Sequence, residues 1–493
     1  MTATAPTTAT AGAMERLARE IEAIVGPQGL IERPEQLRVY ESDGLTAFRQ
    51  TPALVVLPAS TAEVRDVVRL CHRYGVPFVP RGSGTGLSGG ALPVEGCVVI
   101  GLSKMTKILA VDLSNQRIVV EPGVLNLWVT QAVAPHGYYY APDPSSQQVC
   151  SIGGNVAENS GGAHCLKYGF TVNHVLGMEI VTPEGEVVEI GASSVEAPGY
   201  DLPGIFVGSE GMLGICTSIT LRLVRRAEAL TLSLVAFATT DAAGEAVSGI
   251  IGAGIVPSAI EMMDNLAIQA TEAATHAGYP LDAGAVLLIE LDGRAVEVEQ
   301  QQAQVEEICR AAGATEVRIA RDAEERILFW KGRKAAFAAM GRLSPNYIVQ
   351  DGVIPRTALP LVLREIAALS EQYGLRVANV FHAGDGNLHP LVLYPDKDDY
   401  ERAEQLAGDI LKTCVAHGGS ITGEHGVGVE KRPYMSVMFT AADMETHQMI
   451  SCAFNPGKLC NPGKVYPTPR LCGETPGKYT PHPLELAGVA DRF

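Results

Sequence analysis

The stretch RGSGTGLSGG, residues 81–90, directly follows the apolar run VPFVP, which is expected to be a β-strand. Glycines let the backbone approach a ligand closely, and successive N–H groups in such a loop can bind phosphate oxygens. The loop is not a Walker loop because no Gly-Lys-Ser/Thr follows, and it lacks the helix and ribose-binding acid of the dinucleotide fingerprint. By itself it indicates either a pyrophosphate cradle or a glycine-rich surface turn.

Two further glycine-rich stretches follow along the chain. They are PDPSSQQVCSIGGNVAENSGG, residues 142–162, and VGSEGMLGICT, residues 207–217. A large flat cofactor with a pyrophosphate needs many close approaches by the backbone, and small residues allow them. Three such loops in one region therefore favour a shared cofactor over three unrelated surface turns.

Length and composition exclude several classes of protein. The chain has 493 residues, of which 46% are hydrophobic, and this predicts two or three globular domains. A net charge of −17 argues against a nucleic-acid partner and against a polybasic membrane anchor. The sequence has no apolar run long enough for a transmembrane segment, and its start lacks the pattern of a secretory signal. The 10 cysteines are scattered without a CxxC pair, which predicts reduced thiols in a cytoplasmic protein.

The order of the expected elements predicts an α+β fold. Residues 13–48 look helical and peripheral, and residues 52–225 alternate strands and helices with long glycine-rich connections. From about residue 230 a β–α–β alternation predicts a mixed antiparallel sheet with helices on one face. The expected parts are a disordered tail (1–12), a first domain (13–228), a second domain (229–467) and a C-terminal tail (468–493).

The stretch VFHAGDGNLHP, residues 380–390, predicts a β-hairpin. Asp385 and Gly386 form a typical two-residue turn, and His382 and His389 flank them symmetrically. The two histidines are then expected to be cross-strand partners on one face. Their Cβ atoms would lie roughly 4.5–5.5 Å apart, which lets both rings reach one metal ion.

A second stretch, TGEHGVGVEK at residues 422–431, offers a third ligand. Histidine pairs that bind a metal usually need such a ligand from elsewhere in the protein. Adjacent side chains in an extended segment point to opposite faces. One of Glu424 and His425 can therefore bind the metal while the other faces a different group.

In this order, the three glycine loops and the motifs FHAGDGNLH, GEHGVG and NPGKV resemble the vanillyl-alcohol oxidase/p-cresol methylhydroxylase (PCMH) superfamily. The resemblance runs from about residue 40 to residue 467 and is to the branch of glycolate oxidase flavin subunits and D-lactate dehydrogenases. It implies a PCMH-type FAD-binding domain, then a ferredoxin-like mixed or antiparallel substrate domain, and a short helical C-terminal part.

The resemblance also implies which residues bind FAD. The residues expected to hold the pyrophosphate are Pro80, Arg81, Gly82, Ser83, Gly84, Thr85, Gly86 and Leu87. Those expected to line the flavin and its ribityl chain are Pro142, Asp143, Ser145, Gly153, Gly154, Asn155 and Ser160. Those expected on the adenine side are Glu210, Gly211, Gly214 and Ile215.

Two details of the FAD site follow from the same resemblance. Asn461, in the second of two NPGK repeats, is expected near the isoalloxazine ring, whereas the first repeat, residues 455–458, has no assigned role. Relatives with covalently linked FAD have a histidine about where Thr85 stands. Thr85 cannot form that bond, so a non-covalent FAD is expected.

For the metal, the resemblance implies that His382, His389 and Glu424 bind a divalent ion, often zinc, and that His425 is the catalytic base. Zinc has no redox chemistry, so it would polarise the hydroxyl of a 2-hydroxy acid while hydride passes from C2 to flavin N5. Arg333, in the helical stretch 325–342, is expected to bind the substrate carboxylate.

The expected substrate is small. Phe337 and Val349 indicate an apolar pocket, which favours a monocarboxylate such as glycolate or D-lactate, or a longer D-2-hydroxy acid. An external electron acceptor is required, because the cysteines form no array that could hold an iron–sulfur cluster. Family analogy implies a second flavin-type subunit and an iron–sulfur subunit, through which this cytoplasmic protein would lie at the membrane periphery.

Three alternatives stay open from the sequence. A D-lactate dehydrogenase is the nearest alternative to a glycolate-oxidising subunit. A metal-dependent hydrolase would use the histidines and the glutamate to activate water, but it leaves the glycine loops unexplained. A non-catalytic flavin-binding subunit would predict a broken metal or base motif, and here all four residues are present.

Overall fold

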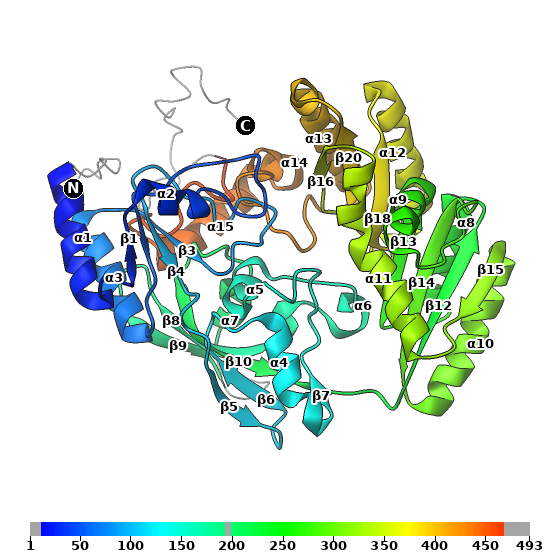
Figure 1. Ribbon diagram of the computed structural model, residues 1–493, viewed down its shortest axis with the longest axis horizontal. Helices are drawn as coiled ribbons and strands as arrows, with labels where there is room; N and C mark the ends of the chain where they lie inside the picture. Colours follow the sequence, from blue (N-terminus) through cyan, green and yellow to red (C-terminus); the bar gives the residue numbers. More distant parts are fainter. Residues whose placement is uncertain (1–10, 193–198, 468–493) are drawn as a thin grey trace.

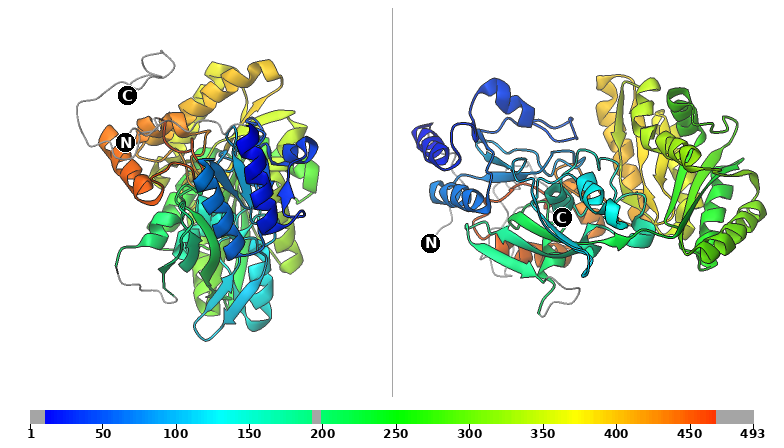
Figure 2. Two further views of the ribbon diagram at one scale, coloured as in Figure 1. Left: turned by 90° about the vertical axis from the view of Figure 1, so that its left-hand side faces the viewer. Right: turned by 60° about the horizontal axis from the view of Figure 1, so that its bottom comes forward.

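The computed structural model describes residues 11–192 and 199–467, which fold into two lobes (Figure 1). The first lobe contains the chain up to Arg225, and the second begins at Ala229 with strand β12. The chain then returns to the first lobe, because Cys460 forms a β-bridge with Phe78. Both views in Figure 2 place the orange C-terminal helices with the first lobe.

The first lobe contains two sheets. One has the order β1-β2-β4-β3, with β2, β4 and β3 parallel, and helices α1 (Ala11–Val25) and α3 (Thr61–Tyr74) pack on it. Its strands are β1 (Leu30–Ile31), β2 (Leu54–Val56), β3 (Phe78–Arg81) and β4 (Val98–Gly101). Ser60 caps the start of α3 and Gly75 ends it in the left-handed region, as is typical of helix ends.

The second sheet of this lobe is antiparallel, with the order β5-β6-β10-β8-β9. Its strands are β5 (Ile108–Asp112), β6 (Arg117–Val120), β8 (Val175–Val181), β9 (Val187–Gly191) and β10 (Ile215–Arg222). One face packs against helices α4 (Asn126–Val133), α5 (Ile152–Glu158) and α7 (Leu202–Phe206). A short pair is formed by β7 (Tyr138–Tyr139) and β11 (Val224–Arg225).

The second lobe begins with a ferredoxin-like β-α-β-β-α-β unit, which confirms the expected α+β fold. Its strands pair in the order β15-β12-β14-β13, and every pair is antiparallel. The elements are β12 (Ala229–Phe237), α8 (Thr240–Gly252), β13 (Ala259–Asp264), β14 (Ala285–Gly293), α10 (Ala295–Ala311) and β15 (Ala314–Ile319).

A second β-α-β-β-α unit continues the same sheet, because β18 pairs with β13. Its elements are β16 (Asn346–Val349), α12 (Leu359–Tyr373), β18 (Val377–His382), β20 (Pro390–Tyr394) and α13 (Tyr400–Ala416). The short strands β17 (Gly352–Val353) and β19 (Asn387–Leu388) extend it beside the hairpin. The last helices of the described residues are α14 (Met435–Met438) and α15 (Ala441–Phe454).

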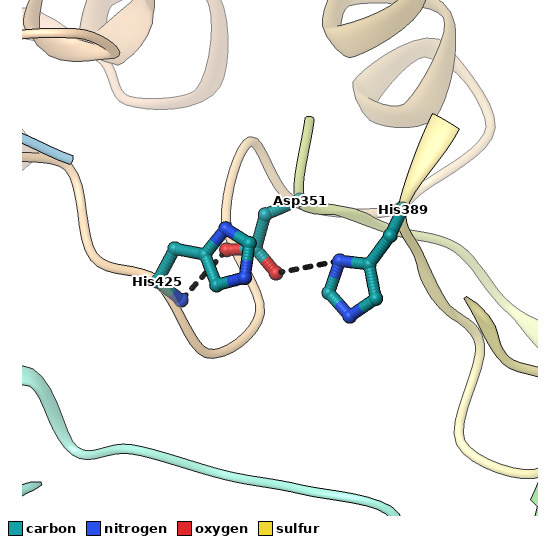
Figure 3. Close-up of side chains that lie close together, drawn as sticks. All are labelled: Asp351, His389 and His425. Carbon is teal, nitrogen blue, oxygen red and sulfur yellow. Dashed lines mark hydrogen bonds and ion pairs between the residues drawn. The ribbon is translucent and has the colours of Figure 1, made fainter. Parts of the chain in front are cut away.

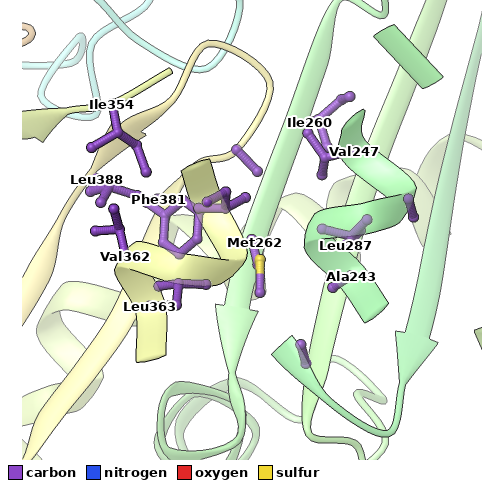
Figure 4. Close-up of a cluster of buried hydrophobic side chains, with 14 of the residues drawn as sticks. Ala243, Val247, Ile260, Met262, Leu287, Ile354, Val362, Leu363, Phe381 and Leu388 are labelled. Atoms are coloured by element: carbon purple, nitrogen blue, oxygen red, sulfur yellow. The ribbon is translucent and has the colours of Figure 1, made fainter. Parts of the chain in front are cut away.

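Helices cover both faces of this sheet, so the expectation of helices on one face is wrong. The four helices α8, α10, α12 and α13 cover one face, where Met262 and Leu287 are buried (Figure 4). Helices α9 (Asn265–Thr275) and α11 (Ala323–Ala339) cover the other face, where Met263 and Leu288 are buried. Neighbouring residues of β13 and β14 point to opposite faces of the sheet. Because apolar residues follow one another along these strands, helices must cover both faces.

The hairpin around Asp385 has a different register from the expected one. His382 pairs with Asn387, not with His389, so the loop contains residues 383–386. The Asp385 side chain accepts a hydrogen bond from Asn387 N at 3.1 Å, which stabilises this wider loop. A register shift of two residues leaves the faces unchanged, so His389 still lies on the side of His382, diagonally across the strands.

Three expectations about the rest of the chain were also tested. Helix α1 begins at Ala11, two residues before the expected start of the first domain at residue 13, and the C-terminal tail lies outside the described residues. Eight cysteines are free and buried, but Cys452 is disulfide-bonded, so the expectation of reduced thiols is wrong there. Within residues 11–192 and 199–467, no helix is long and apolar enough to cross a membrane.

Leu287, at the centre of the sheet, provides a test of the two-sided core. Its side chain is fully buried between Met262 and Val247 (Figure 4), so Leu287→Ala should lower the free energy of unfolding by about 2–5 kcal/mol. Ile327, which is 68% exposed on α11, is the control, and Ile327→Ala should have little effect. Denaturant unfolding of both variants measures the difference, and equal effects would contradict the described core.

Candidate active site

A cavity of about 1300 Å³ lies where the two lobes meet. Pockets for one small ligand usually measure roughly 300–1,000 Å³, so this cavity has room for a large cofactor and a substrate together. All three glycine loops of the first lobe line it, and so do α11 and β16 of the second lobe and the loop that carries Glu424 and His425. Residues 44–49 also line it, so this part of the segment 13–48 is not peripheral as expected.

The first glycine loop has the close backbone packing that the sequence predicted. A Cβ atom on Gly82 would clash with Ser151, and one on Gly84 would clash with the guanidinium of Arg81. Arg81 is buried over the ring of Tyr40, and its Nη1 has no hydrogen-bond partner within the described chain. An unpartnered buried cation beneath a glycine loop fits a bound phosphate group.

The second glycine loop leads into α5, and an asparagine that the sequence analysis missed holds it in place. Asn126 Nδ2 donates to Pro142 O and to Asn155 Oδ1, both at 3.0 Å. Of the residues expected to line the flavin, Ser145, Gly153, Gly154, Asn155 and Ser160 line the cavity. Pro142 and Asp143 do not line it, and the Asp143 carboxylate instead binds His164.

The third glycine loop is held by both NPGK repeats. Asn461 Nδ2 donates to Gly90 O at 2.8 Å and to Glu210 O at 2.6 Å, so Asn461 joins the first and third loops. Asn455, in the first repeat, donates to Met212 O at 3.1 Å. Asn461 does not line the cavity, whereas the four residues expected on the adenine side do. The first repeat thus has a structural contact that the sequence did not predict.

His382, His389 and Glu424 come together as the sequence predicted. The Nε2 atoms of His382 and His389 lie 3.2 and 3.1 Å from the same oxygen, Glu424 Oε1. The centroids of the two imidazole rings are 5.1 Å apart, and the ring planes are nearly perpendicular. Glu424 Oε2 is buried without a hydrogen-bond partner among the described residues. Three such ligands with one side open to a cavity match a catalytic metal site.

The other ring nitrogens of these histidines are held by acceptors. His382 Nδ1 lies 2.7 Å from Glu261 Oε1, and His389 Nδ1 lies 3.3 Å from the carbonyl oxygen of Gln350. Such partners orient metal-binding histidines, because they leave Nε2 free of a proton for the metal. Glu261, from β13, was missed by the sequence analysis because no motif marks it.

The charges around His382 favour a cation at this position. Burial lowers the pKa of His382, but Glu261 and Glu424 outweigh it and hold the pKa well above its usual value. Burial raises the pKa of Glu261, but His382 and Arg333 outweigh it and lower the pKa to about 2. The cluster therefore binds a positive charge, which a metal ion would supply in place of the proton.

Arg333 lies behind the expected metal ligands, on Glu261, and does not line the cavity. Its Nη2 lies 2.6 Å from Glu261 Oε2, and its side chain is almost fully buried. Lys334 and Phe337, from the same helix, do line the cavity, as does Val349 from β16. The Phe337 ring contacts the ring of His389, with centroids 6.0 Å apart.

A second group, Asp351, His389 and His425, also brings three ligand types together (Figure 3). This group does not fit a metal cation, because the Asp351 carboxylate already accepts hydrogen bonds from several donors. Asp351 Oδ2 accepts from Thr422 Oγ1 at 2.6 Å and from the N–H groups of Gly423 and His425 at 2.9 Å. The ammonium group of Lys431 lies 3.3 Å from the same oxygen and would repel a metal ion.

Two buried carboxylates hold the whole loop that carries Glu424 and His425. Asp351 binds its first part, and Glu210 accepts from Val427 N at 2.7 Å and Gly428 N at 2.8 Å. A Cβ atom on Gly428 would clash with the Ser88 carbonyl, so glycine is needed there. Glu210 belongs to the first lobe and Asp351 to the second, so both lobes fix this loop.

His425 faces the cavity from this loop. Its ring stacks on that of His389, with centroids 5.0 Å apart and planes 8° from parallel. Burial lowers the pKa of His425 to about 4, so the imidazole is neutral at pH 7. Its Nδ1 is buried without a hydrogen-bond partner among the described residues.

Comparisons with known protein families match both lobes. An FAD binding domain matches residues 52–191, and the C-terminal domain of FAD linked oxidases matches residues 226–465. The glycolate oxidase subunit GlcD of Escherichia coli K12 is 50% identical over 92% of this chain and 91% of its own length. A D-lactate dehydrogenase of Anaerostipes hadrus is 32% identical over 90% of this chain and 95% of its own length.

Solved structures show the same fold at low identity. p-Cresol methylhydroxylase with substrate bound has a TM-score of 0.79 and 16% identity, covering 94% of this chain and 98% of that one. 4-Ethylphenol oxidase from Gulosibacter chungangensis has a TM-score of 0.77 and 18% identity, covering 94% and 99%. The two family matches and the identity to GlcD show that the chain belongs to the FAD-linked oxidases, and the solved structures show that it shares the fold of p-cresol methylhydroxylase.

Proposed function

We propose that this protein oxidises a small 2-hydroxy acid to the 2-oxo acid, with non-covalently bound FAD and a divalent metal, zinc in our proposal. The observation that carries the proposal is the position of His425. Its neutral imidazole opens onto the same cavity as the glycine loops and lies against His389, one of the three expected metal ligands. The relatives named glycolate oxidase subunit and D-lactate dehydrogenase support this substrate class.

Each group has a distinct task in this proposal. When bound, FAD supplies a hydride acceptor, and the metal on His382, His389 and Glu424 supplies a Lewis acid for the substrate hydroxyl. His425 takes the hydroxyl proton, because its imidazole is neutral at neutral pH and therefore has one ring nitrogen with a free lone pair. Thr85 in the first loop cannot link to the flavin, which supports non-covalent FAD.

The substrate is proposed to be glycolate or D-lactate, with a longer D-2-hydroxy acid as the alternative. Phe337 and Val349 make one side of the cavity apolar, which disfavours a second carboxylate. Arg333 was the expected partner of the single carboxylate, but it does not line the cavity, because its Nη2 pairs with Glu261 Oε2. In this structure Arg333 supports His382 through Glu261.

Electrons must leave the protein through an external acceptor. The eight free cysteines are buried and dispersed, so the described residues offer no ligand array for an iron–sulfur cluster. The relative GlcD is named as a subunit of glycolate oxidase. We propose the same arrangement here, with a second flavin-type subunit, an iron–sulfur subunit and peripheral attachment to the membrane through them. A metal-dependent hydrolase is no longer supported, because the chain is an FAD-linked oxidase.

Flavin reduction under anaerobic conditions tests the activity. Glycolate or D-lactate should bleach the absorbance near 450 nm, whereas L-lactate and D-2-hydroxyglutarate should not. His425→Gln should slow this reduction by about 10²–10⁴-fold without loss of FAD, because a general base contributes that much. A protein that retains FAD but is not reduced by any of the four acids would contradict the proposed substrate class. A His425→Gln variant that reacts at the normal rate would exclude His425 as the base.

Metal binding is tested through Glu261, which orients His382. Glu261→Gln should weaken metal binding about 10–100-fold, because a neutral amide orients the imidazole less strongly than a carboxylate. Metal content after dialysis against graded chelator concentrations measures this directly. Glu365, which pairs with His417 at 3.0 Å, gives the matched control Glu365→Gln, which should bind metal normally. Equal metal content in both variants, or no bound metal in the unmodified protein, would contradict the proposed site.

A further inference from the structure

A short segment of the first lobe, around helix α6 (Cys165–Tyr168), reaches the sheet of the second lobe (Figure 1). Leu166 packs so closely on Gly384 that a Cβ atom there would clash with it. At the start of the segment, Gly162 lies against the Asp143 carbonyl with no room for a side chain. The segment is therefore fixed to the flavin-lining loop at one end and to the second lobe at the other.

His164, which precedes α6, binds a carboxylate of each lobe. Its Nδ1 lies 2.8 Å from Asp143 Oδ2 in the first lobe, and its Nε2 lies 2.9 Å from Glu290 Oε1 on β14. The side chains of Asp143 and Glu290 are 14% and 6% exposed, so both carboxylates are largely shielded from water. His164 is thus the cation between two otherwise repelling charges.

The two bonds require the charged form of His164. A neutral imidazole has one N–H group and can donate to only one carboxylate, whereas an imidazolium donates to both. Burial lowers the pKa of His164, but Asp143 and Glu290 outweigh it and hold the pKa well above its usual value. The other groups at this contact, Ser258 and Trp330, are neutral. The bridge is therefore formed at neutral pH.

Asp143 and Glu290, the two carboxylates that bind His164, are each connected to a wall of the cavity. Asp143 directly precedes Pro144 and Ser145, which line the cavity on the flavin side. On the other side, Glu290 Oε2 accepts from Trp330 Nε1 at 2.8 Å, and Trp330 lies on α11. The same helix places Lys334 and Phe337 in the cavity wall.

We propose that His164 is a positioning residue for hydride transfer, which joins the flavin-lining loop to helix α11 and so sets the distance between the two walls of the cavity. This inference rests on the proposed oxidation of a 2-hydroxy acid. His164 does not line the cavity and acts through Asp143 and Glu290. Lys167 and Tyr168 also bind Asp292 and hold the two lobes together without His164. The loss of His164 therefore changes the alignment of the cavity walls more than it weakens the contact between the lobes.

The first test distinguishes an effect of His164 on the alignment of the two cavity walls from an effect on substrate binding. In anaerobic stopped-flow experiments, His164→Gln should lower the limiting rate of flavin reduction about 10–100-fold, because a misplacement near 1 Å can cost that much. The dissociation constant of the substrate and the FAD content should stay within about threefold of normal. His164→Arg, which restores a cation with several donors, should recover part of the rate. A normal limiting rate in His164→Gln would overturn the proposal.

The second test determines whether His164 acts through its ion pair with Glu290. Glu290→Gln should slow reduction to the same extent, and the double variant His164→Gln/Glu290→Gln should be no slower than either single variant, because all remove one interaction. Effects that multiply in the double variant would overturn the assignment. His417, which is 24% exposed like His164 and pairs with Glu365 at 3.0 Å, is the matched control. His417→Gln should leave the rate unchanged.

A third readout needs no substrate. Hydrogen exchange of the FAD-loaded protein should rise at residues 142–146 and 285–293 in His164→Gln, but not in His417→Gln. If no 2-hydroxy acid reduces the unmodified protein, the proposed function fails, while the exchange still decides whether His164 joins the two lobes. Unchanged exchange at both segments would overturn the inference. A rate loss fully explained by lost FAD would also overturn it, because His164 would then act only on stability.

Discussion

The buried carboxylate of Asp351 is the interaction on which the active centre depends. It accepts hydrogen bonds from Thr422, Gly423 and His425, and the ammonium group of Lys431 neutralises it. A loop without regular secondary structure leaves its N–H groups without partners, and burying them unpaired would be costly. Asp351 satisfies these groups together, so the loop can be buried while Glu424 faces the two histidines and His425 faces the cavity.

The same loop also joins the two lobes. Glu210, from the third glycine loop of the first lobe, binds the N–H groups of Val427 and Gly428, just beyond the part that Asp351 holds. The proposed metal ligands and the cofactor loops are therefore not independent sites placed side by side. Any change in the packing of the lobes moves His425 relative to the glycine loops, because its loop is bound to both. His164 joins the same two lobes at a separate contact, between Asp143 and Glu290.

The residues that the sequence analysis found share one property: their chemistry is readable from residue type and local spacing. The glycine loops line one cavity, and His382, His389 and Glu424 meet at one carboxylate oxygen. The expected hairpin register was wrong, and the histidines met only because the shift was two residues. Glu261, Asp351 and Asn126 were missed, because a single buried acid or amide carries no local pattern that distinguishes it from any other.

The sequence by itself determined the α+β class, the cofactor loops and the residues proposed to bind a metal, because glycine spacing and ligand type act over a few neighbouring residues. Only the tertiary structure decided which partner each polar group has. Arg333 pairs with Glu261, Asn461 joins two glycine loops, and His164 binds Glu290. Each of these contacts joins segments far apart in the chain, and strand order, register and the docking of the lobes bring them together. Those are properties of the packed molecule, because most buried polar groups pair only once the lobes have closed around them.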